Sequence, residues 1–536
     1  MRLENNNPSL FSLTIYYLQK RDFLAAIQTG IKALEETPSH VDTWLNLASA
    51  YFNLAQFDKA CDALEKGLKL SPKHVNMLVL ASGAFAKRGE FGKAIECCQK
   101  VLALEKRHAL ASSHLAHCYN KVRDYEKAVA SAKKALQIEP SSHSWLELGL
   151  AQLYLEQPEQ ALASFQKGLM LDPHLVDLLS NSAMALAYLG RTDEAVLMNQ
   201  KALSLDPEHE SALNNQAKML CDLGRYEEGI DLFKKVLSKR PDHWEVVWNL
   251  SVVYLLLGRF EEGLDLYQQR LNVEDFHQHH QKLSSPSWQG EDLQVKTLLV
   301  RCEQGYGDSI QFLRYIPRLA KLGCQIAIEM PPELHGLFGH LGAELIGNSS
   351  EVPKHDFQVR LMSLMHLLPE KLSNIPPPVS LAQSFLCPQK NQIGLVWRGN
   401  PKHRKDRQRS LTLEQLKPLF QLKGLQFVCL QQKITEEERK FLEEKGVELH
   451  PLNSWQDTVS RLETCEKVIC VDTSVAHLAA SMGLATWILL PYVPDWRWQL
   501  ERTDSPWYPS VQLFRQKELD RWDEPIQRIV EQVKIC

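Results

Sequence analysis

The sequence predicts a helical solenoid over the first half of the chain and an α/β region with parallel strands over the second. Two observations predict the solenoid. Proline recurs at steps of 34, 68, 33, 34 and 34 residues, at Pro38, Pro72, Pro140, Pro173, Pro207 and Pro241. Small residues recur in the same register. The third observation concerns the second half, where short runs of Val, Ile and Leu alternate with helical segments.

A fixed period near 34 residues is typical of tetratricopeptide repeats, in which each unit is a helical hairpin that packs on its neighbours. Small residues fall where the two helices of a hairpin must approach closely, at Ala48, Ser82, Ala116, Gly149, Ala183, Ala217 and Ser251. A second small position reads Ala26, Ala60, Ala94, Ala128, Ala161, Ala195, Gly229 and Gly263. The pattern predicts about eight repeats over residues 7–277.

The concave face of such an array is the usual docking surface. Asparagine occupies the sixth position of four repeats, at Asn46, Asn181, Asn215 and Asn249. A side-chain amide both donates and accepts hydrogen bonds, which suits a groove that binds peptide backbone of any sequence. The alternative is that asparagine is simply frequent at this position, and both interpretations stay open.

Composition excludes several classes of protein. A net charge of −4 gives no general attraction to nucleic acid or to an anionic membrane. No run of 18 apolar residues predicts a spanning helix, and the first residues lack the basic-then-apolar order of a secretory signal. The twelve cysteines form no CxxC pair, as is typical of reduced thiols. We therefore expect a cytoplasmic protein without a membrane span or nucleic-acid partner.

The repeat pattern fades into a polar, histidine-rich stretch, and we expect a linker at residues 278–292. His277, His279 and His280 have no carboxylate or cysteine at a fixed spacing, so a solvated linker is favoured over a metal site.

Beyond the linker we expect two doubly wound lobes, at residues 293–385 and 391–536, the second closed by an amphipathic helix at about 523–536. The expected strands are rich in Val, Ile and Leu with little alternation, as strands buried on both faces are: 297–302, 325–330, 393–397, 426–430, 467–472 and 485–490. Ligands bind such sheets at the carboxyl ends of the strands.

The first lobe has a candidate residue at the end of its first strand. Gly305 and Gly307 permit a tight turn there, and a helix opens near Asp308. An acidic side chain in this position is a candidate base. It also has a structural interpretation, as the cap of the helix.

The second lobe has a basic loop after its first strand. Six cations lie within twelve residues: Arg398, Lys402, Arg404, Lys405, Arg407 and Arg409. This concentration suits a ligand that carries phosphate, since arginine offers a bidentate fork to phosphate oxygens. A solvated loop is the alternative. A nucleic-acid patch is less favoured because no aromatic residues lie between the charges.

A third candidate follows a buried strand of the same lobe. Asp472, Thr473 and Ser474 form a turn before a helix of small residues, whose free N–H groups favour an anion. His477 lies one turn further and is either a core histidine or a donor to the ligand. The aromatic residues Trp496, Trp498, Trp507 and Tyr508, which lie near Asp495, Arg497 and Arg502, either form a ligand platform or bury a contact between lobes.

Together these motifs resemble bacterial tetratricopeptide proteins whose C-terminal domain is a GT-B glycosyltransferase of two Rossmann-like lobes. That domain is related in pattern to the ADP-heptose:lipopolysaccharide heptosyltransferases and, more distantly, to the protein O-GlcNAc transferases, and some members of the group glycosylate flagellin. The matching residues are Pro286, Trp288 and Gly290; Glu303, Gln304, Gly305, Gly307 and Asp308; Trp397, Gly399, Asn400, His403, Arg409 and Ser410; Asp472, Thr473, His477, Leu478 and Ala479; Asp495 to Trp498; and Ser505 to Pro509.

The resemblance implies a role for each of these groups. Asp308 matches the proposed base that deprotonates the acceptor hydroxyl. The donor would be held by Gly305, Gly307, Trp397, Asn400, His403, Arg409, Asp472, Thr473, Ser474 and His477. Arg409 stands where the heptosyltransferases use lysine, and a long basic loop precedes it, which leaves the donor's identity open. By resemblance to the O-GlcNAc transferases, the asparagine row would grip an acceptor peptide.

The predicted function is transfer of a sugar from a nucleotide sugar to a Ser or Thr hydroxyl of a protein held by the repeats. No Asp-x-Asp pair follows a strand, so we expect neither a metal nor any cofactor besides the nucleotide-sugar substrate. Two alternatives remain. The acceptor is a glycolipid or polysaccharide precursor, or the chain is a scaffold whose GT-B domain is degenerate and not catalytic.

Overall fold

The computed structural model describes residues 9–273, 283–347, 351–368, 375–381, 388–401 and 406–535. The chain divides into two compact units, residues 1–232 and 233–536. The division falls inside one helix, α14 (Tyr226–Lys239). The last hairpin of the helical region therefore belongs to the same unit as the α/β region.

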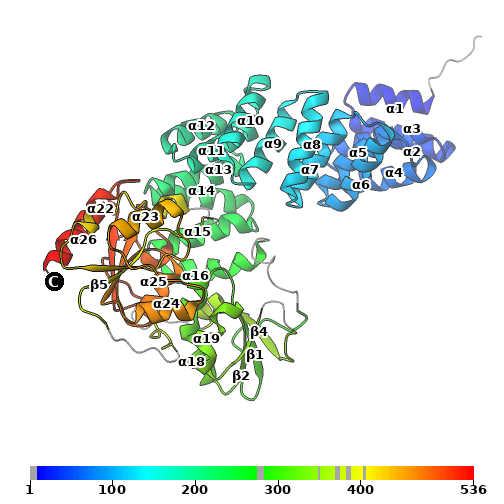
Figure 1. Cartoon of the computed structure of the whole chain (residues 1–536). Helices are drawn as coiled ribbons and strands as arrows, with labels where there is room; N and C mark the ends of the chain where they lie inside the picture. The colour runs from blue at the N-terminus through cyan, green and yellow to red at the C-terminus, as the bar shows by residue number, and fades with distance from the viewer. Residues whose placement is uncertain are drawn as a thin grey trace, which may run out of the picture. The chain divides into compact units, whose positions relative to one another are not determined.

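The helical region consists of sixteen helices that form eight consecutive hairpins (Figure 1). The helices other than α14 are α1 (Leu10–Gln19), α2 (Phe23–Glu36), α3 (Val41–Asn53), α4 (Phe57–Leu70), α5 (Val75–Lys87), α6 (Phe91–Leu104), α7 (Ala109–Lys121), α8 (Tyr125–Ile138), α9 (Ser142–Tyr154), α10 (Pro158–Leu171), α11 (Val176–Tyr188), α12 (Thr192–Leu205), α13 (Glu210–Asp222), α15 (Trp244–Leu256) and α16 (Phe260–Gln268). The predicted solenoid of about eight hairpins is confirmed.

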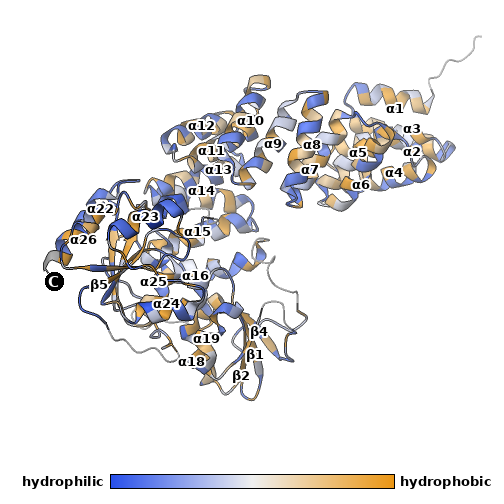
Figure 2. Ribbon diagram, in the orientation of Figure 1, coloured by the Kyte–Doolittle hydropathy of each residue, from blue (hydrophilic) through white to orange (hydrophobic). Residues whose placement is uncertain are grey.

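The small residues lie where the helices of a hairpin meet. Ala48 and Ala60 are both fully buried, as are their counterparts in the neighbouring repeats. At Gly149 a β-carbon would lie 2.3 Å from a ring carbon of Phe165 on the paired helix. Side chains larger than glycine or alanine would separate the helices at these points, which explains the repeat of small residues along the sequence. The helices carry both hydrophilic and hydrophobic residues (Figure 2).

The α/β region contains two parallel sheets. The first has strand order β3-β2-β1-β4, with β1 (Thr297–Arg301), β2 (Gln325–Glu329), β3 (Glu344–Ile346) and β4 (Phe357–Arg360). The second has order β6-β5-β7-β8-β9, with β5 (Gln392–Val396), β6 (Gln426–Cys429), β7 (Lys467–Val471), β8 (Ala485–Leu490) and β9 (Val511–Arg515). Every strand pair is parallel, as the strand–helix alternation predicts.

The six expected strands are present to within one residue at either end, but β3, β4 and β9 were missed. The reason is local. β3 has only three residues, and β4 and β9 each contain a glutamine and an arginine, unlike the continuous apolar runs of the central strands.

Short helices connect and cover these strands. They are η1 (Gln269–Asn272), α17 (Tyr306–Phe312), η3 (Leu313–Tyr315), α18 (Ile316–Ala320), η4 (Pro332–Leu334), α19 (His335–Phe338), η5 (Gly339–Leu341), η6 (Leu361–Ser363), α20 (Leu364–Leu367), α21 (Asp406–Arg409), α22 (Lys417–Phe420), α23 (Glu436–Glu444), α24 (Trp455–Leu462), α25 (Ser474–Ser481), η8 (Trp496–Trp498) and α26 (Asp523–Ile535). α26 is the expected closing helix; it packs through Ile526 and Ile529 into the core beside the second sheet.

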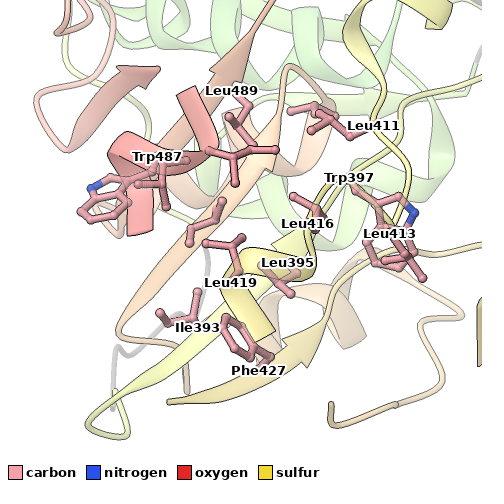
Figure 3. Packing of buried hydrophobic residues seen from close by; sticks show 14 of the residues in the cluster. Ile393, Leu395, Trp397, Leu411, Leu413, Leu416, Leu419, Phe427, Trp487 and Leu489 are labelled. Carbon is pink, nitrogen blue, oxygen red and sulfur yellow. The ribbon is translucent and has the colours of Figure 1, made fainter. Parts of the chain in front are cut away.

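That core surrounds the first strand of the second sheet. Ile393, Leu395 and Trp397 lie in one cluster with Leu416, Leu419, Phe427, Trp487 and Leu489 (Figure 3). The loops that leave the carboxyl edge of this sheet carry the candidate residues of the second lobe.

The structure describes residues 283–292 of the expected linker, and Ser287 there forms a β-bridge with Gln358 of β4. Trp288 is buried, and its backbone N–H donates to the carbonyl of Gln358 in β4. His277, His279 and His280 lie outside the described residues. Within the described residues we find no helix with the length and hydrophobicity that crossing a membrane requires.

Candidate functional site

Asp308 lies in the first turn of α17, directly after the strand β1 and its loop. Its Oδ2 accepts the backbone N–H of Gly305 at 2.9 Å, so the carboxylate caps the helix. Its Oδ1 accepts a hydrogen bond from Nη2 of Arg497, which lies on η8 between β8 and β9 of the second sheet. Asp308 is therefore both a cap and one half of an ion pair between the two lobes.

Arg497 is the centre of this arrangement and is 6% exposed. Its Nε donates to Oε1 of Gln311 at 2.9 Å, and its Nη1 donates to Oδ1 of Asp495 at 2.8 Å. The guanidinium also lies over the rings of Phe312 and Trp496, 5.4 and 4.6 Å from their centroids. With three acceptors in three directions, the orientation of the guanidinium is fixed.

The two candidate turns meet through α17 and α25. A β-carbon on Gly307 would lie 2.9 Å from Cδ2 of His477 and 3.5 Å from Cα of Ser474. Only glycine permits this approach without displacement of a neighbour. The structure thus brings the loop of Asp308 against the start of α25, where Thr473 and Ser474 lie.

His477 and Asp472 lie in the same cluster. Nε2 of His477 is 3.9 Å from Oδ1 of Asp472, and its Nδ1 is 3.0 Å from the hydroxyl of Tyr508. The imidazole stacks on Trp498 with 5.4 Å between centroids. The buried hydroxyl of Thr473 has no hydrogen-bond partner within the described residues, as is expected of a group that a ligand would satisfy.

Burial shifts the protonation of these groups. It lowers the pKa of His477 to about 3, and the charge of Arg497 acts in the same direction, so the imidazole is neutral at pH 7. Burial, with the nearby charge of Asp495, raises the pKa of Asp472 to about 6. Burial also raises the pKa of Asp308, although Arg497 opposes that shift. For Asp495, burial is outweighed by Arg497, and the pKa is lowered.

Arg409 contributes from the second lobe. Its Nε donates to Oδ1 of Asp406 at 3.2 Å, and its charge opposes the rise in the pKa of Asp472 that burial causes. A β-carbon on Gly399 would lie 2.7 Å from a guanidinium nitrogen of Arg409, so the chain after β5 passes directly beside this side chain. Arg398 instead pairs with Glu438, and His403 with its three basic neighbours at 402, 404 and 405 lies outside the described residues.

The aromatic candidates are packed inside the protein. Trp397 is 1% exposed, lies in the core of Figure 3 and donates to Glu438 at 3.2 Å. Trp496, Trp498, Trp507 and Tyr508 are all buried. Phe312 of the first lobe contacts Trp496 and Trp507, so these aromatic residues bury a contact between the lobes. Asn400, three residues after Trp397, is exposed.

Sequence reasoning left Gln311 and Arg314 out of the site. Both are buried, and each has one nitrogen without a hydrogen-bond partner within the described residues. Arg314 donates to the carbonyls of Pro376 and Trp507, and thereby ties the first lobe to the segment between lobes and to the aromatic loop. The one sequence signal for them is their spacing: Gln311 and Arg314 come three and six residues after Asp308, near the same face of a helix that begins there.

The asparagine row is not uniform. Asn46 and Asn249 are partly exposed, and Asn181 donates within its own helix to the carbonyl of Asp177. Asn215 is 9% exposed, and its amide donates to Oγ of Ser180 on the neighbouring hairpin at 3.0 Å. The amide of Asn215 therefore serves the packing of the array, and a groove role for the row stays a prediction.

No group of three or more His, Cys, Asp or Glu side chains in the described ranges is arranged to hold a metal ion. Asp308, Asp472 and Asp495 each lie beside an arginine or histidine instead.

Models described as tetratricopeptide repeat match residues 41–74, 111–142, 142–175, 180–239 and 220–284. Among curated proteins, Protein FlbA of Caulobacter vibrioides is 25% identical over 287 residues, or 45% of this chain and 47% of that protein. The chain thus spans about half the length of the curated relative it matches.

The chain is also similar to solved structures. A tetratricopeptide repeat protein from Parabacteroides merdae has 16% identity and a TM-score of 0.41, and the match covers 46% of this chain and 97% of that one. YrrB, a tetratricopeptide protein with an unusual peptide-binding site, has 22% identity and a TM-score of 0.28, over 35% of this chain and 97% of its own. The matched repeat models and the helical hairpins agree, and the N-terminal region of this chain is a tetratricopeptide array.

Proposed function

We propose that the chain is a glycosyltransferase that moves a sugar from a nucleotide-sugar donor to a protein hydroxyl. One observation carries the proposal. The loop of Asp308 in one lobe and the turn of Asp472 to His477 in the other lie against each other, with Arg497 bonded to Asp308 between them. A carboxylate after a strand of the first sheet suits transfer from a diphosphate donor when it faces a neutral imidazole and a helix N-terminus after a strand of the second.

In this proposal Asp308 accepts the proton of the acceptor hydroxyl as its oxygen bonds to the anomeric carbon of the donor. The bond from that carbon to the diphosphate oxygen breaks, and the nucleoside diphosphate leaves. A positioned carboxylate base contributes about 10²–10⁴ in rate. Each oxygen of Asp308 holds one hydrogen bond, which orients the carboxylate and leaves a lone pair on each oxygen for the proton.

The charge that develops on the leaving diphosphate would be met from the second lobe. Arg409 and the N–H groups at the start of α25 favour an anion there, and the hydroxyl of Thr473 has no hydrogen-bond partner among the described residues. His477 is neutral, so it acts as a hydrogen-bond partner of the donor and not as a cation. The acceptor is proposed to be a protein because a tetratricopeptide array offers a docking surface for one.

A second candidate, a scaffold without catalysis, is favoured by a specific observation. Both oxygens of Asp308 are already bonded, one as a helix cap and one to Arg497, and a purely structural clamp would look the same. The two candidates differ in two measurable properties, because the scaffold is expected neither to bind a nucleotide sugar nor to transfer one.

The test is thermal unfolding of the full chain with UDP, ADP, GDP and CMP sugars. A ligand at 100 times its dissociation constant should stabilise the protein by about 2.7 kcal/mol. Asp308→Asn should keep that stabilisation and abolish transfer. Protection by none of the donors would favour the scaffold, and unchanged turnover of Asp308→Asn would remove Asp308 as the base.

A further inference from the structure

The last hairpin of the array, formed by α15 and α16 with η1, contacts both loops that carry the Asp308–Arg497 pair. All of these segments lie within one compact unit, residues 233–536. The hairpin reaches the Asp308 loop through Arg270 and Tyr267. It reaches the Arg497 loop through Gly258.

Arg270 fixes the beginning of the Asp308 loop. It is fully buried on η1, and its guanidinium makes a bidentate ion pair with Glu303. The distances are 2.5 Å from Nη2 to Oε1 and 3.3 Å from Nε to Oε2. Nη2 also donates to Ser363 at 3.0 Å, and Oε1 of Glu303 accepts the N–H of Met362 at 3.2 Å. Glu303 precedes Gly305 by two residues, so this ion pair determines where the turn starts.

Tyr267 fixes the next residue of the loop. It is 2% exposed on α16, and its hydroxyl accepts a hydrogen bond from Nε2 of Gln304 at 3.4 Å. Gln304 has φ of 63°, a left-handed conformation that a residue with a side chain rarely adopts. The ring of Tyr267 also lies 6.0 Å from that of Trp496, beside Arg497.

The Arg497 loop has a matching feature. Gln499 has φ of 52°, also left-handed. It ends the turn of η8, which packs on α15. A β-carbon on Gly258, in the turn between α15 and α16, would lie 3.0 Å from Nε2 of Gln499. One hairpin therefore contacts the residue with positive φ in each loop, Gln304 in one and Gln499 in the other.

We propose that this hairpin positions the Asp308–Arg497 pair. Tyr267 does so through its contact with Gln304, and Gly258 through its contact with Gln499. Unfavourable backbone conformations persist only when the surroundings hold them, and they cluster at functional sites. Here the surroundings are supplied by the final tetratricopeptide repeat. The catalytic part of this inference rests on the proposed function, whereas the ordering of the two loops does not.

The experiment uses the full chain with two variants and two matched controls. Tyr267→Phe removes the hydroxyl that accepts from Gln304 and keeps the ring. Its control is Tyr254→Phe, a buried tyrosine on the same hairpin. Gly258→Ala adds a methyl toward Gln499. Its control is Gly190→Ala, because Gly190 has φ of 75° in an earlier hairpin turn, equal to the φ of 75° at Gly258, and carries the same backbone cost.

Two measurements are made on all four proteins. Hydrogen–deuterium exchange should rise several-fold at residues 303–309 in Tyr267→Phe and at residues 495–499 in Gly258→Ala, and stay at the wild-type level in both loops of the controls. With the donor and acceptor found active for the wild type, kcat should fall about ten- to hundredfold in both variants with donor KM unchanged.

Unchanged exchange in both loops, or equal increases in the variants and their controls, would overturn the proposal. A fall in donor affinity with kcat preserved would also overturn it, because the hairpin would then act on binding. If the wild type transfers no sugar, the proposed function fails, and the exchange measurement alone decides whether the hairpin orders the two loops.

Discussion

Gly307 on α17 and His477 on α25 lie in direct contact, so that a β-carbon on the glycine would be 2.9 Å from Cδ2 of the imidazole. Since His477 is also held by Tyr508 and stacked on Trp498, it has little room to move away. The spacing of the two lobes at the candidate site is therefore limited by the size of residue 307.

We expect Gly307→Ala to destabilise the protein by about 1–3 kcal/mol, because the added methyl overpacks this contact. Urea unfolding measures the loss. Gly305→Ala is the matched control: it lies two residues away, has φ of −86°, and its β-carbon would meet Oδ2 of Asp308 at an ordinary 3.5 Å. Equal stability of the two variants would contradict the close contact.

The free energy of unfolding should decrease as the pH is lowered, because protonation of His477 is disfavoured in the folded state. The folded pKa of His477 is about 3, below the ordinary value near 6.5, so its neutral form is favoured by folding. The contribution is complete above about pH 6.5 and is lost as the pH falls toward 3, with about 2 kcal/mol lost at pH 5.

The comparison of wild type with His477→Gln isolates this loss. Asp472, whose pKa is raised to about 6, has the opposite sign, since its protonation favours the folded state as pH falls through 6. Asp472 is present in both proteins, so its contribution largely cancels in the difference. Unfolding free energies measured from pH 7 to pH 5 should converge between the two proteins, and a constant difference would be the contrary result.

The Asp308–Arg497 pair should show strong coupling. Arg497→Met leaves Asp308, whose side chain is 19% exposed, and Asp495, whose side chain is 38% exposed, without their common partner. Since water reaches both carboxylates in part, we expect a loss of about 1.5–3 kcal/mol. In Asp308→Asn the same arginine substitution should cost less. A double-mutant cycle by urea unfolding measures the coupling, and purely additive losses would show that the pair is not an energetic unit.

The asparagine row should separate into two kinds of residue. Asn215→Ala removes a buried donor to Ser180, which itself bonds to Asn199, and should cost about 1–2 kcal/mol in thermal or urea unfolding. Asn181→Ala removes a bond within one helix and should cost less. Equal losses would contradict the assignment of Asn215 to the packing of the array.

A groove role is better tested without Asn215. Replacing Asn181 and Asn249 together should weaken protein acceptors and spare hydrolysis of the donor, if the row grips peptide. A loss of donor hydrolysis equal to the loss of acceptor transfer would count against that role.

The array could be predicted from the sequence because its constraint is local and repeated. Each hairpin needs a small residue where its helices cross, so Ala48, Ala116 and Ala183 recur in register with the prolines. The central strands could be predicted for a similar reason, since a strand buried on both faces is apolar throughout. Edge strands such as β9 are harder to predict, because Gln512 and Arg515 interrupt the apolar residues of VQLFR.

The candidate site was predictable only in part. Asp308 follows the first strand of the first sheet, and Asp472 and His477 follow a strand of the second. Since ligands bind at the carboxyl ends of such strands, the strand pattern alone indicates these positions. Arg497 lies in a loop more than 180 residues from Asp308 in sequence, and no periodic pattern links the two. The partners of Arg270 and Arg314 are likewise set by packing between segments distant along the chain.

The eight hairpins also have a consequence for how such a chain can change over generations. A hairpin packs on its immediate neighbours, so a whole unit can be gained or lost before residue 226 without new partners for the rest. The final hairpin has no such freedom. Its loss would remove Arg270 and leave Glu303 as an uncompensated charge. Length can vary at one end of the array, in steps of about 34 residues, while the other end is held to a single form.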